Sequence, residues 1–353
     1  MPRETKRAKK GSGNTLTYVS MGISVLALIM AVVAIAMPHT KVVTIYQNAT
    51  VPTTTVQALA GYDITSNLPA PALTLSDAPI ITTAGTPGNN LQDINAQLNA
   101  SELYVINKAP DAYFELAGEM LLNGTLNNSV GIKTSSVPLF KVNGKPSVIY
   151  LGSTTCIYCA ENKWSMALAL SRFGNFTYLF HGYSALKDGD APTLYWTPVR
   201  YNTLSTAFGS FYTSNYINFI AIEDSAPITG GFRLEDLGTL LGRANETNSL
   251  AYVDALKYIG EINTFGGTPY TIWGTYVAPG ADAIAFGNSS KQITLMNMTH
   301  ADMIRMLQEG KSQMALTEYA GADYYAAMIC KSTNSAAAIC GLPAIKKIEA
   351  TLS

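Results

Sequence analysis

The chain has 353 residues, a formal net charge of -1 and 48% hydrophobic residues. This length provides for one large domain or two ordinary ones, and the near-zero charge argues against nucleic acid as a partner. Charged residues make up only 13% of the chain, about half of the ~25% usual in globular proteins. A surface with so few carboxylates changes little as pH falls, which indicates either an acid-exposed protein or compositional drift.

The N-terminal residues predict a membrane anchor. Residues 1–15 are basic, and residues 16–37 form a mostly apolar run without charged residues that is long enough to cross a bilayer. By the positive-inside rule, residues 1–15 lie in the cytoplasm and the rest of the chain lies outside. The alternative is a cleaved signal peptide, because Ala34-Ile35-Ala36 has a small-x-small pattern. In both cases, the residues that follow the apolar run lie outside the cytoplasm.

Sequons for N-glycosylation support export. All of them follow the apolar run, at Asn48, Asn99, Asn123, Asn127, Asn175, Asn245, Asn288 and Asn297. Chance accounts for about half of them in a chain this rich in Asn, Ser and Thr, so glycosylation is a hypothesis. Residues 38–90 have few charges and many Thr, Pro and Ala residues, which predicts a partly extended tether.

Helix and strand patterns begin at residue 91. Residues 91–134 predict a helical lead-in that Pro110 interrupts. The segment "PLFKVNGKPSVIYLGS" predicts a short strand, an Asn143-Gly144 turn and a buried strand over Ser147–Leu151. The segment "AENKWSMALALSRFG", which follows the second of two nearby cysteines, predicts a helix that ends at Gly174.

The second half of the chain continues the alternation. Strands are predicted in "NFTYLFHGY", "NYINFIAIED", "TPYTIWGTYV" and "ADAIAFG", with a mostly helical stretch over residues 233–263. A further helix has a capping-box-like start at Thr299 and Asp302 and ends at Gly310, and residues 311–353 predict a helical extension. This order predicts an α/β fold whose central strands are covered on both faces.

Cys156 and Cys159 stand at the end of a predicted strand and open a helix. A helix N-terminus stabilises a thiolate and lowers the pKa of the first cysteine, and the second cysteine can resolve a mixed disulfide. This chemistry needs an exposed nucleophile and a shielded partner. The alternatives are a structural disulfide and half of a zinc site. Zinc would need two further ligands, for which the candidates are His39, His181, His300, Cys330 and Cys340.

The order of strand, Cys-x-x-Cys, helix and downstream Thr-Pro resembles the thioredoxin fold. The parts here are Cys156-Ile157-Tyr158-Cys159 and Thr268-Pro269. The resemblance implies that Pro269 is cis and faces the cysteines, and that Thr268 offers backbone hydrogen bonds to an extended substrate. It covers about residues 135–310, and it implies a DsbA-like plan with a helical insertion at about residues 228–262.

The whole chain also resembles an uncharacterised archaeal family of membrane-anchored, thioredoxin-like proteins, domain of unknown function 929. The resemblance lies in the Gly-Ser-x-x-Cys-x-x-Cys segment and the "INFIAIED" strand, and it implies a fold but no established activity. Two features depart from the thioredoxin pattern. The spacer is Ile157-Tyr158, and the strand Ser147–Leu151 has no acidic residue that could accept a proton. Glu161 and Lys163 lie nearby but are expected to be solvated.

Cys330 and Cys340 form a second pair in the helical extension. An αα-hairpin could bring them together, and a disulfide that closes this short loop would contribute roughly 3 kcal/mol in the chain-entropy model. The alternative is a second redox couple that relays electrons to Cys156 and Cys159.

The sequence therefore predicts a thiol–disulfide oxidoreductase that is anchored in the cell membrane, with its C-terminal domain outside. Cys156 and Cys159 would be catalytic, and Thr268-Pro269 would dock the substrate. The expected partners are cysteine-containing exported proteins or a membrane redox partner, and the lipid bilayer through residues 16–37; no cofactor or metal is expected. The alternative is a non-catalytic thioredoxin-fold binding or envelope-assembly module whose Cys-x-x-Cys is a structural disulfide.

Overall fold

The computed structural model describes residues 62–64, 95–126, 135–154, 156–184, 191–199, 204–209, 211–224, 250–262, 268–279 and 298–352. All of these ranges belong to one compact unit, Ala58–Ser353. The predicted cytoplasmic segment and anchor, residues 1–37, lie outside them, as does the strand predicted in "ADAIAFG". Within the described ranges, none of the helices has the length and apolar character needed to span a membrane.

The fold is mixed α/β, as predicted. Seven α-helices lie in the described ranges: α2 Ala100–Asn107, α3 Asp111–Leu122, α4 Ile157–Ser171, α6 Leu250–Ile262, α8 His300–Glu309, α9 Gln313–Ser332 and α10 Pro343–Thr351. The strands are β1 Tyr62–Ile64, β2 Ser135–Ser136, β3 Phe140–Val142, β4 Lys145–Ser153, β5 Gly174–Phe176, β6 Phe180–Tyr183, β7 Pro192–Tyr195, β8 Leu204–Ala207, β9 Tyr212–Ser214, β10 Asn218–Asp224, β11 Tyr270–Trp273 and β12 Tyr276–Pro279.

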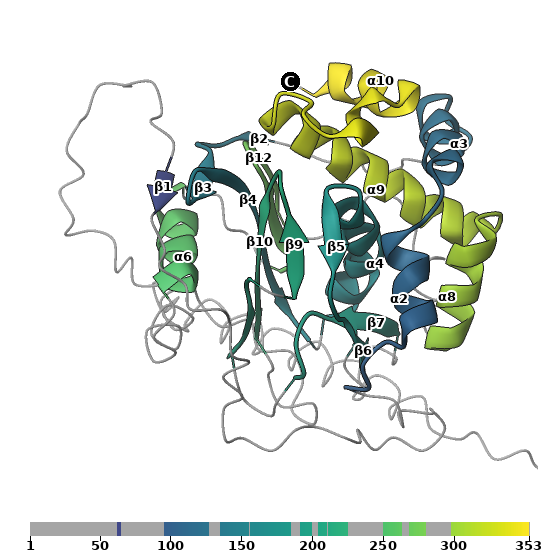
Figure 1. The fold of residues 1–353 in the computed structure, drawn as a ribbon, viewed down its shortest axis with the longest axis horizontal. Coiled ribbons are helices and arrows are strands. Elements are labelled where there is room, and N and C mark those ends of the chain that lie inside the picture. The colour runs from purple at the N-terminus through teal and green to yellow at the C-terminus, as the bar shows by residue number, and fades with distance from the viewer. Residues whose placement is uncertain are drawn as a thin grey trace, which may run out of the picture. The chain divides into compact units, whose positions relative to one another are not determined.

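Strand β4 is the centre of the main sheet (Figure 1). It pairs in parallel with β10 on one side and antiparallel with β11 on the other. Strand β12 pairs antiparallel with β11, and β8 pairs antiparallel with β10. The hairpin from β3 to β4 turns at Asn143 and Gly144, whose φ angles of 52° and 78° fit the predicted tight turn.

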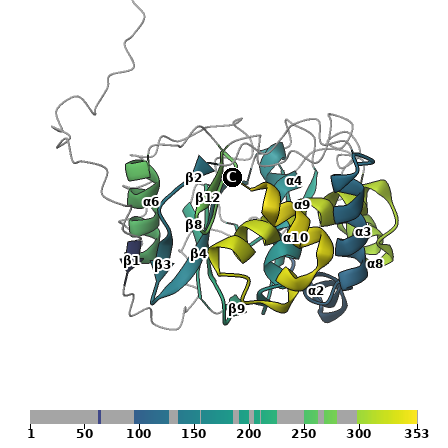
Figure 2. The same ribbon diagram turned by 90° about the horizontal axis from the view of Figure 1, so that it is seen from above.

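Helices cover both faces of this sheet, as the sequence predicted. Side chains alternate along β4, so that Val148 and Tyr150 join one apolar core and Ile149 and Leu151 join another. The first core includes α4 and α9, and the second includes α6. Figures 1 and 2 show α6 on one side of the sheet and α4 with α9 on the other.

The predicted lead-in and the C-terminal extension meet around α4. Helix α9 packs along both α4 and α3, and α10 packs on α3 and α9. Two polar contacts tie α9 to α4: Tyr325 donates to Asn162, and Ser165 donates to Glu318. Helix α4 is therefore enclosed between the sheet and α9, which explains why nearly all of its side chains are buried.

Several element boundaries differ from the sequence prediction. Helix α2 begins at Ala100 because the Asn99 side chain caps it by accepting from the backbone N–H groups of Ser101 and Glu102. The backbone N–H of Leu98, which was predicted to be helical, donates to the carbonyl of Leu179, next to β6. Residues Tyr62–Ile64, within the predicted tether, pair in parallel with β3. Helix α8 has the expected capping box.

Cys330 and Cys340 form a disulfide in the structure, with their Cα atoms 5.6 Å apart. The bond ties the end of α9 to the turn before α10. The two residues are 0% and 1% exposed, so soluble thiols cannot reach the bond in the folded protein. This burial fits the structural staple better than the redox relay that the sequence left open.

Candidate thiol site

Cys156 is the N-cap residue of α4. Strand β4 ends at Ser153, and the chain turns into the helix after Cys156, whose backbone is still extended. The Cys156 Sγ atom accepts a hydrogen bond from the backbone N–H of Cys159 at 3.4 Å. The strand-to-helix junction thus places the first cysteine where free N–H groups and the helix dipole stabilise a thiolate.

The structure brings Thr268 and Pro269 to this cysteine. The Cys156 Sγ atom lies 3.8 Å from the carbonyl oxygen of Thr268, which is 112 residues away in sequence. The Thr268–Pro269 peptide bond is cis, as the resemblance implied. Strand β11 begins directly after Pro269 and pairs with β4, so the sheet itself holds this loop beside the cysteines.

The two thiols differ in acidity. A hydrogen bond with the Cys159 thiol lowers the pKa of Cys156, and the backbone N–H groups of Cys159 and Tyr158 lower it further, while burial opposes the shift. Burial raises the pKa of Cys159 well above its ordinary value. The first cysteine is therefore the better nucleophile at neutral pH, and the second stays protonated until a base takes its proton.

Of the two cysteines, only Cys159 has the exposure that exchange chemistry was expected to need. Both are free thiols, and Cys159 is the shielded partner that exchange chemistry needs, with 0% of its surface exposed. Cys156, however, is only 5% exposed instead of open to solvent. The Thr268 carbonyl lies against its sulfur, while Tyr158 in the spacer is the exposed member of the motif at 42%.

Lys163 and Glu161 are buried, which corrects the expectation that both are solvated. Lys163 is 1% exposed and forms an ion pair with Glu223 of β10, which is 2% exposed. The prediction failed because it treated α4 as a surface helix. In the structure the strands meet Lys163, through Glu223 and Tyr150, and α9 covers another face of the helix. A usable signal was the position of Lys163 four residues after Cys159, because residues at that spacing share a helix face.

Tyr150 of β4 completes the surroundings of the buried cysteine. The Lys163 Nζ atom lies 5.6 Å from the centre of the Tyr150 ring. Burial, followed by the proximity of Cys159, raises the pKa of Tyr150 well above its ordinary value, so this phenol stays protonated. Burial also raises the pKa of Glu223, although Lys163 opposes the shift. The site therefore contains a carboxyl group that binds a proton more readily than an ordinary glutamate does.

Gly152 makes room for Tyr150, and its replacement by alanine gives a direct test. A Cβ atom at Gly152 would lie 2.0 Å from the Tyr150 hydroxyl oxygen, so Gly152→Ala has to displace a fully buried ring. We expect a loss of about 1–3 kcal/mol in the free energy of unfolding, as for other overpacked cores. Gly341→Ala is the matched control, because nothing lies within 4 Å of its Cβ position. Equal urea midpoints for the two variants would contradict the packing of Tyr150.

The histidines form a separate cluster. His181 and His300 stack with their ring centres 4.4 Å apart, and His181 lies 3.3 Å from Glu102. Burial, followed by the charge of His181, lowers the pKa of His300 to about 3. In the part of the chain that the structure describes, no three His, Cys, Asp or Glu side chains are grouped to hold a metal ion.

Comparison with known proteins gives one match. A family model described as "Domain of unknown function (DUF929)" matches residues 132–231. This region contains β4, the cysteine pair, α4 and β10 but ends before Thr268 and Pro269. Neither a curated protein nor a solved structure matches the chain. Residues 132–231 are thus similar to an uncharacterised family, as the sequence resemblance implied for this part of the chain.

Proposed function

We propose that this protein has a thioredoxin-like fold and is a thiol–disulfide oxidoreductase. One observation carries the proposal: the Cys156 sulfur, at the N-terminus of α4, lies 3.8 Å from the carbonyl oxygen of Thr268, which directly precedes Pro269. The sheet supports the fold assignment. The strand before the cysteines lies between a parallel strand, β10, and an antiparallel strand, β11, which follows the cis proline and pairs with β12.

The exchange would proceed in two steps that balance in electrons. The Cys156 thiolate attacks one sulfur of a substrate disulfide, which forms a mixed disulfide and releases the other substrate sulfur as a thiolate. Cys159 then loses its proton and attacks the Cys156 sulfur, so that a Cys156–Cys159 disulfide forms and the second substrate thiolate leaves. The substrate is reduced by two electrons and the protein is oxidised; the reverse sequence oxidises a substrate dithiol.

The ion pair of Lys163 and Glu223 supports the second step. Cys159 is fully buried and needs a base to become a nucleophile. The charge of Lys163 favours the Cys159 thiolate. Glu223, which is paired with Lys163 and has a raised pKa, is the proposed proton acceptor. This pair takes the place of the acidic residue that the strand Ser147–Leu151 lacks.

The proposed location is the outer side of the cell membrane, with residues 16–37 as a single-pass anchor and exported, cysteine-containing proteins as substrates. The apolar run, the basic residues before it and the sequons after it support this location. Cys330–Cys340 supports it as well, because stable disulfides are typical of oxidising compartments.

The test is the reduction potential of the Cys156–Cys159 pair, measured by thiol alkylation of the full chain after equilibration in glutathione buffers. An exchange-competent pair should have a potential above about -250 mV, and iodoacetamide should modify Cys156 before Cys159. Cys159→Ser should trap a mixed disulfide on Cys156, whereas Cys156→Ser should trap none. A potential below about -300 mV without any trapped disulfide would contradict the proposal.

A second candidate function is a non-catalytic binding or envelope-assembly module. The 5% exposure of Cys156 favours it, because an attacking sulfur has to reach a substrate disulfide. In that case the pair would be a permanent disulfide in the protein as isolated, and alkylation without prior reduction would modify neither cysteine.

A further inference from the structure

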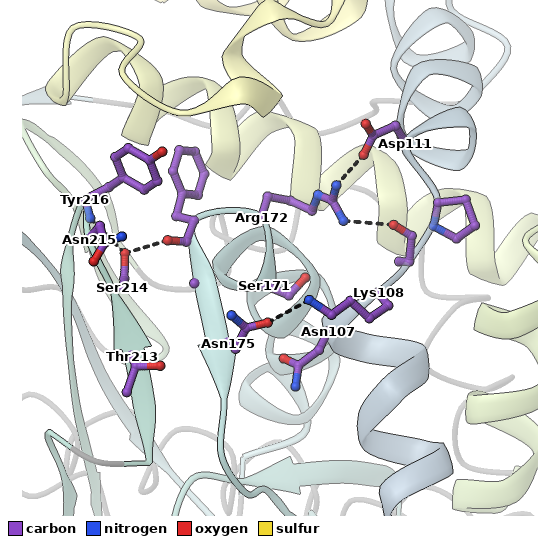
Figure 3. A pocket seen from close by; sticks show the side chains of 14 residues that line it. Asn107, Lys108, Asp111, Ser171, Arg172, Asn175, Thr213, Ser214, Asn215 and Tyr216 are labelled. Atoms are coloured by element: carbon purple, nitrogen blue, oxygen red, sulfur yellow. Dashed lines mark hydrogen bonds and ion pairs between the residues drawn. The ribbon is translucent and has the colours of Figure 1, made fainter.

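A polar pocket lies at the end of α4 that is remote from the cysteines. Its volume is about 580 Å³, within the range of small-molecule sites. One wall is the junction of α2 and α3 at residues 107–111, the opposite wall is β9 with the turn after it at residues 213–216, and the floor is residues 171–175 (Figure 3). Helix α4 has 15 residues, so the pocket is about 22 Å along its axis from Cys156.

Hydrogen bonds hold the walls of this pocket in place. The Asn107 side chain bonds both the N–H and the carbonyl of Phe176, each at 2.9 Å. Ser214 Oγ donates to the Phe173 carbonyl and accepts from the backbone N–H of Tyr216. Arg172 bonds the Ala109 carbonyl and pairs with Asp111. The pocket is therefore formed before any ligand arrives, which lowers the entropic cost of binding.

The rim keeps polar groups available for a ligand. The Lys108 ammonium donates to Asn175 Oδ1 at 3.1 Å, which leaves its other two N–H bonds and the Asn175 Nδ2 group as donors (Figure 3). Within the described ranges, the side chains of Thr213, Asn215 and Tyr216 have no hydrogen bond, and they add donors and acceptors from the opposite wall.

Strand β5 adds backbone groups to the floor. Phe176 directs its N–H and carbonyl to Asn107 instead of to β9. Backbone groups two residues apart on an antiparallel strand point to the same side, so the N–H and carbonyl of Gly174 also face away from β9 and into the pocket. Gly174 is required here, because a Cβ atom would lie 2.3 Å from the Thr213 carbonyl oxygen.

The charges of the pocket point to an uncharged ligand. Asp111 neutralises Arg172, and the remaining cation, Lys108, is exposed and bonded to a neutral amide. A single exposed cation contributes little to the binding of an anion. The lining also has too few apolar side chains for an apolar ligand. What remains are amides, hydroxyls and backbone groups of both donor and acceptor type, together with the ring of Tyr216.

We propose that this pocket binds a short neutral oligosaccharide. Sugar hydroxyls both donate and accept, so they match the mixture of groups at Lys108, Asn175, Thr213 and Asn215, and the Tyr216 ring offers a surface for sugar C–H groups. Two sources could supply the ligand: a glycan of another molecule, or the chain's own glycan at Asn175, which lies in a sequon within the pocket. The proposal does not depend on the thiol chemistry.

The test uses the full chain produced in a host that adds no N-glycans and kept in a detergent without a sugar head group. N,N′-diacetylchitobiose, cellotriose and maltotriose are the probes, titrated by calorimetry and saturation-transfer NMR. At least one probe should bind, and Tyr216→Ala and Asn215→Ala should each weaken it tenfold or more. Asn123→Ala, an exposed asparagine outside the pocket, should leave the affinity unchanged.

Two results would contradict the binding of an oligosaccharide in this pocket. Failure of all three probes to bind at about 10 mM, a concentration that reveals even very weak sites, would overturn the proposal. So would binding that Tyr216→Ala and Asn215→Ala leave intact. Mass spectrometry of chain made in a glycosylating host separates the sources: a glycan on Asn175 that blocks the probe indicates the chain's own sugar, and bare Asn175 with retained binding indicates a foreign one.

Discussion

Replacing Lys163 by methionine should lower the free energy of unfolding by about 3–5 kcal/mol, because Glu223 then remains buried without its counter-charge. The double variant Lys163→Met, Glu223→Leu should recover most of this loss, since an apolar pair needs no desolvation of charge. Urea unfolding of the single and double variants measures the coupling directly. Lys257→Met is the matched control, because Lys257 is 55% exposed in a surface pair with Asp254 and should change stability little.

The same variants separate a structural role of the pair from a role in exchange. In the folded double variant, Cys159 has lost both the charge that favours its thiolate and the proposed proton acceptor. We therefore expect slower release of glutathione from a Cys156 mixed disulfide, with the rate recovering as pH rises. Equal release rates at neutral pH in wild type and double variant would leave the pair with a structural role only.

Replacing Asp323 by asparagine should change how stability depends on pH. Asp323 of α9 is fully buried, and neither carboxyl oxygen has a hydrogen-bond partner in the described part of the chain. Burial, followed by the proximity of Glu115, raises the pKa of Asp323 well above its ordinary value. The folded protein thus holds a proton that the unfolded chain releases near pH 4.

The sign of the effect follows from this difference. A raised pKa in the folded state contributes stability that is fully present below the unfolded pKa and is lost as pH rises toward the folded pKa. Wild type should therefore lose up to about 1.4 kcal/mol for each pH unit above about 4, relative to Asp323→Asn. Urea unfolding at pH 4, 5, 6 and 7 measures the difference, and parallel curves for the two proteins would show that Asp323 ionises normally.

Asp302 is the control of opposite sign. Hydrogen bonds from Thr299 lower the pKa of this exposed carboxyl at the start of α8. Its contribution is present above the unfolded pKa and is lost as pH falls through the folded one. Asp302→Asn should therefore be less stable than wild type at neutral pH, and this difference should shrink as pH falls. Asp323→Asn should be more stable than wild type at neutral pH, and its advantage should also shrink as pH falls.

Local signals determined a large part of this protein. The Asn143-Gly144 turn, the strand and helix around Cys156, the Thr299 capping box and the helices of residues 313–351 are all readable in the sequence, because turn residues, caps and hydrophobic period act over only a few residues. The placement of Cys156 at a helix start follows from the same signals. The disulfide of Cys330 and Cys340 also needed only a short loop between two helical segments.

Only the tertiary structure decided the environment of these residues. Burial depends on what packs over a face, and no local pattern reveals that α9, which begins more than 140 residues after α4, covers it. Other contacts between segments far apart in the sequence bury the pair of Lys163 and Glu223, place Thr268 against the Cys156 sulfur and stack His181 on His300. The pocket of residues 107–111, 171–175 and 213–216 likewise exists only because three distant segments meet.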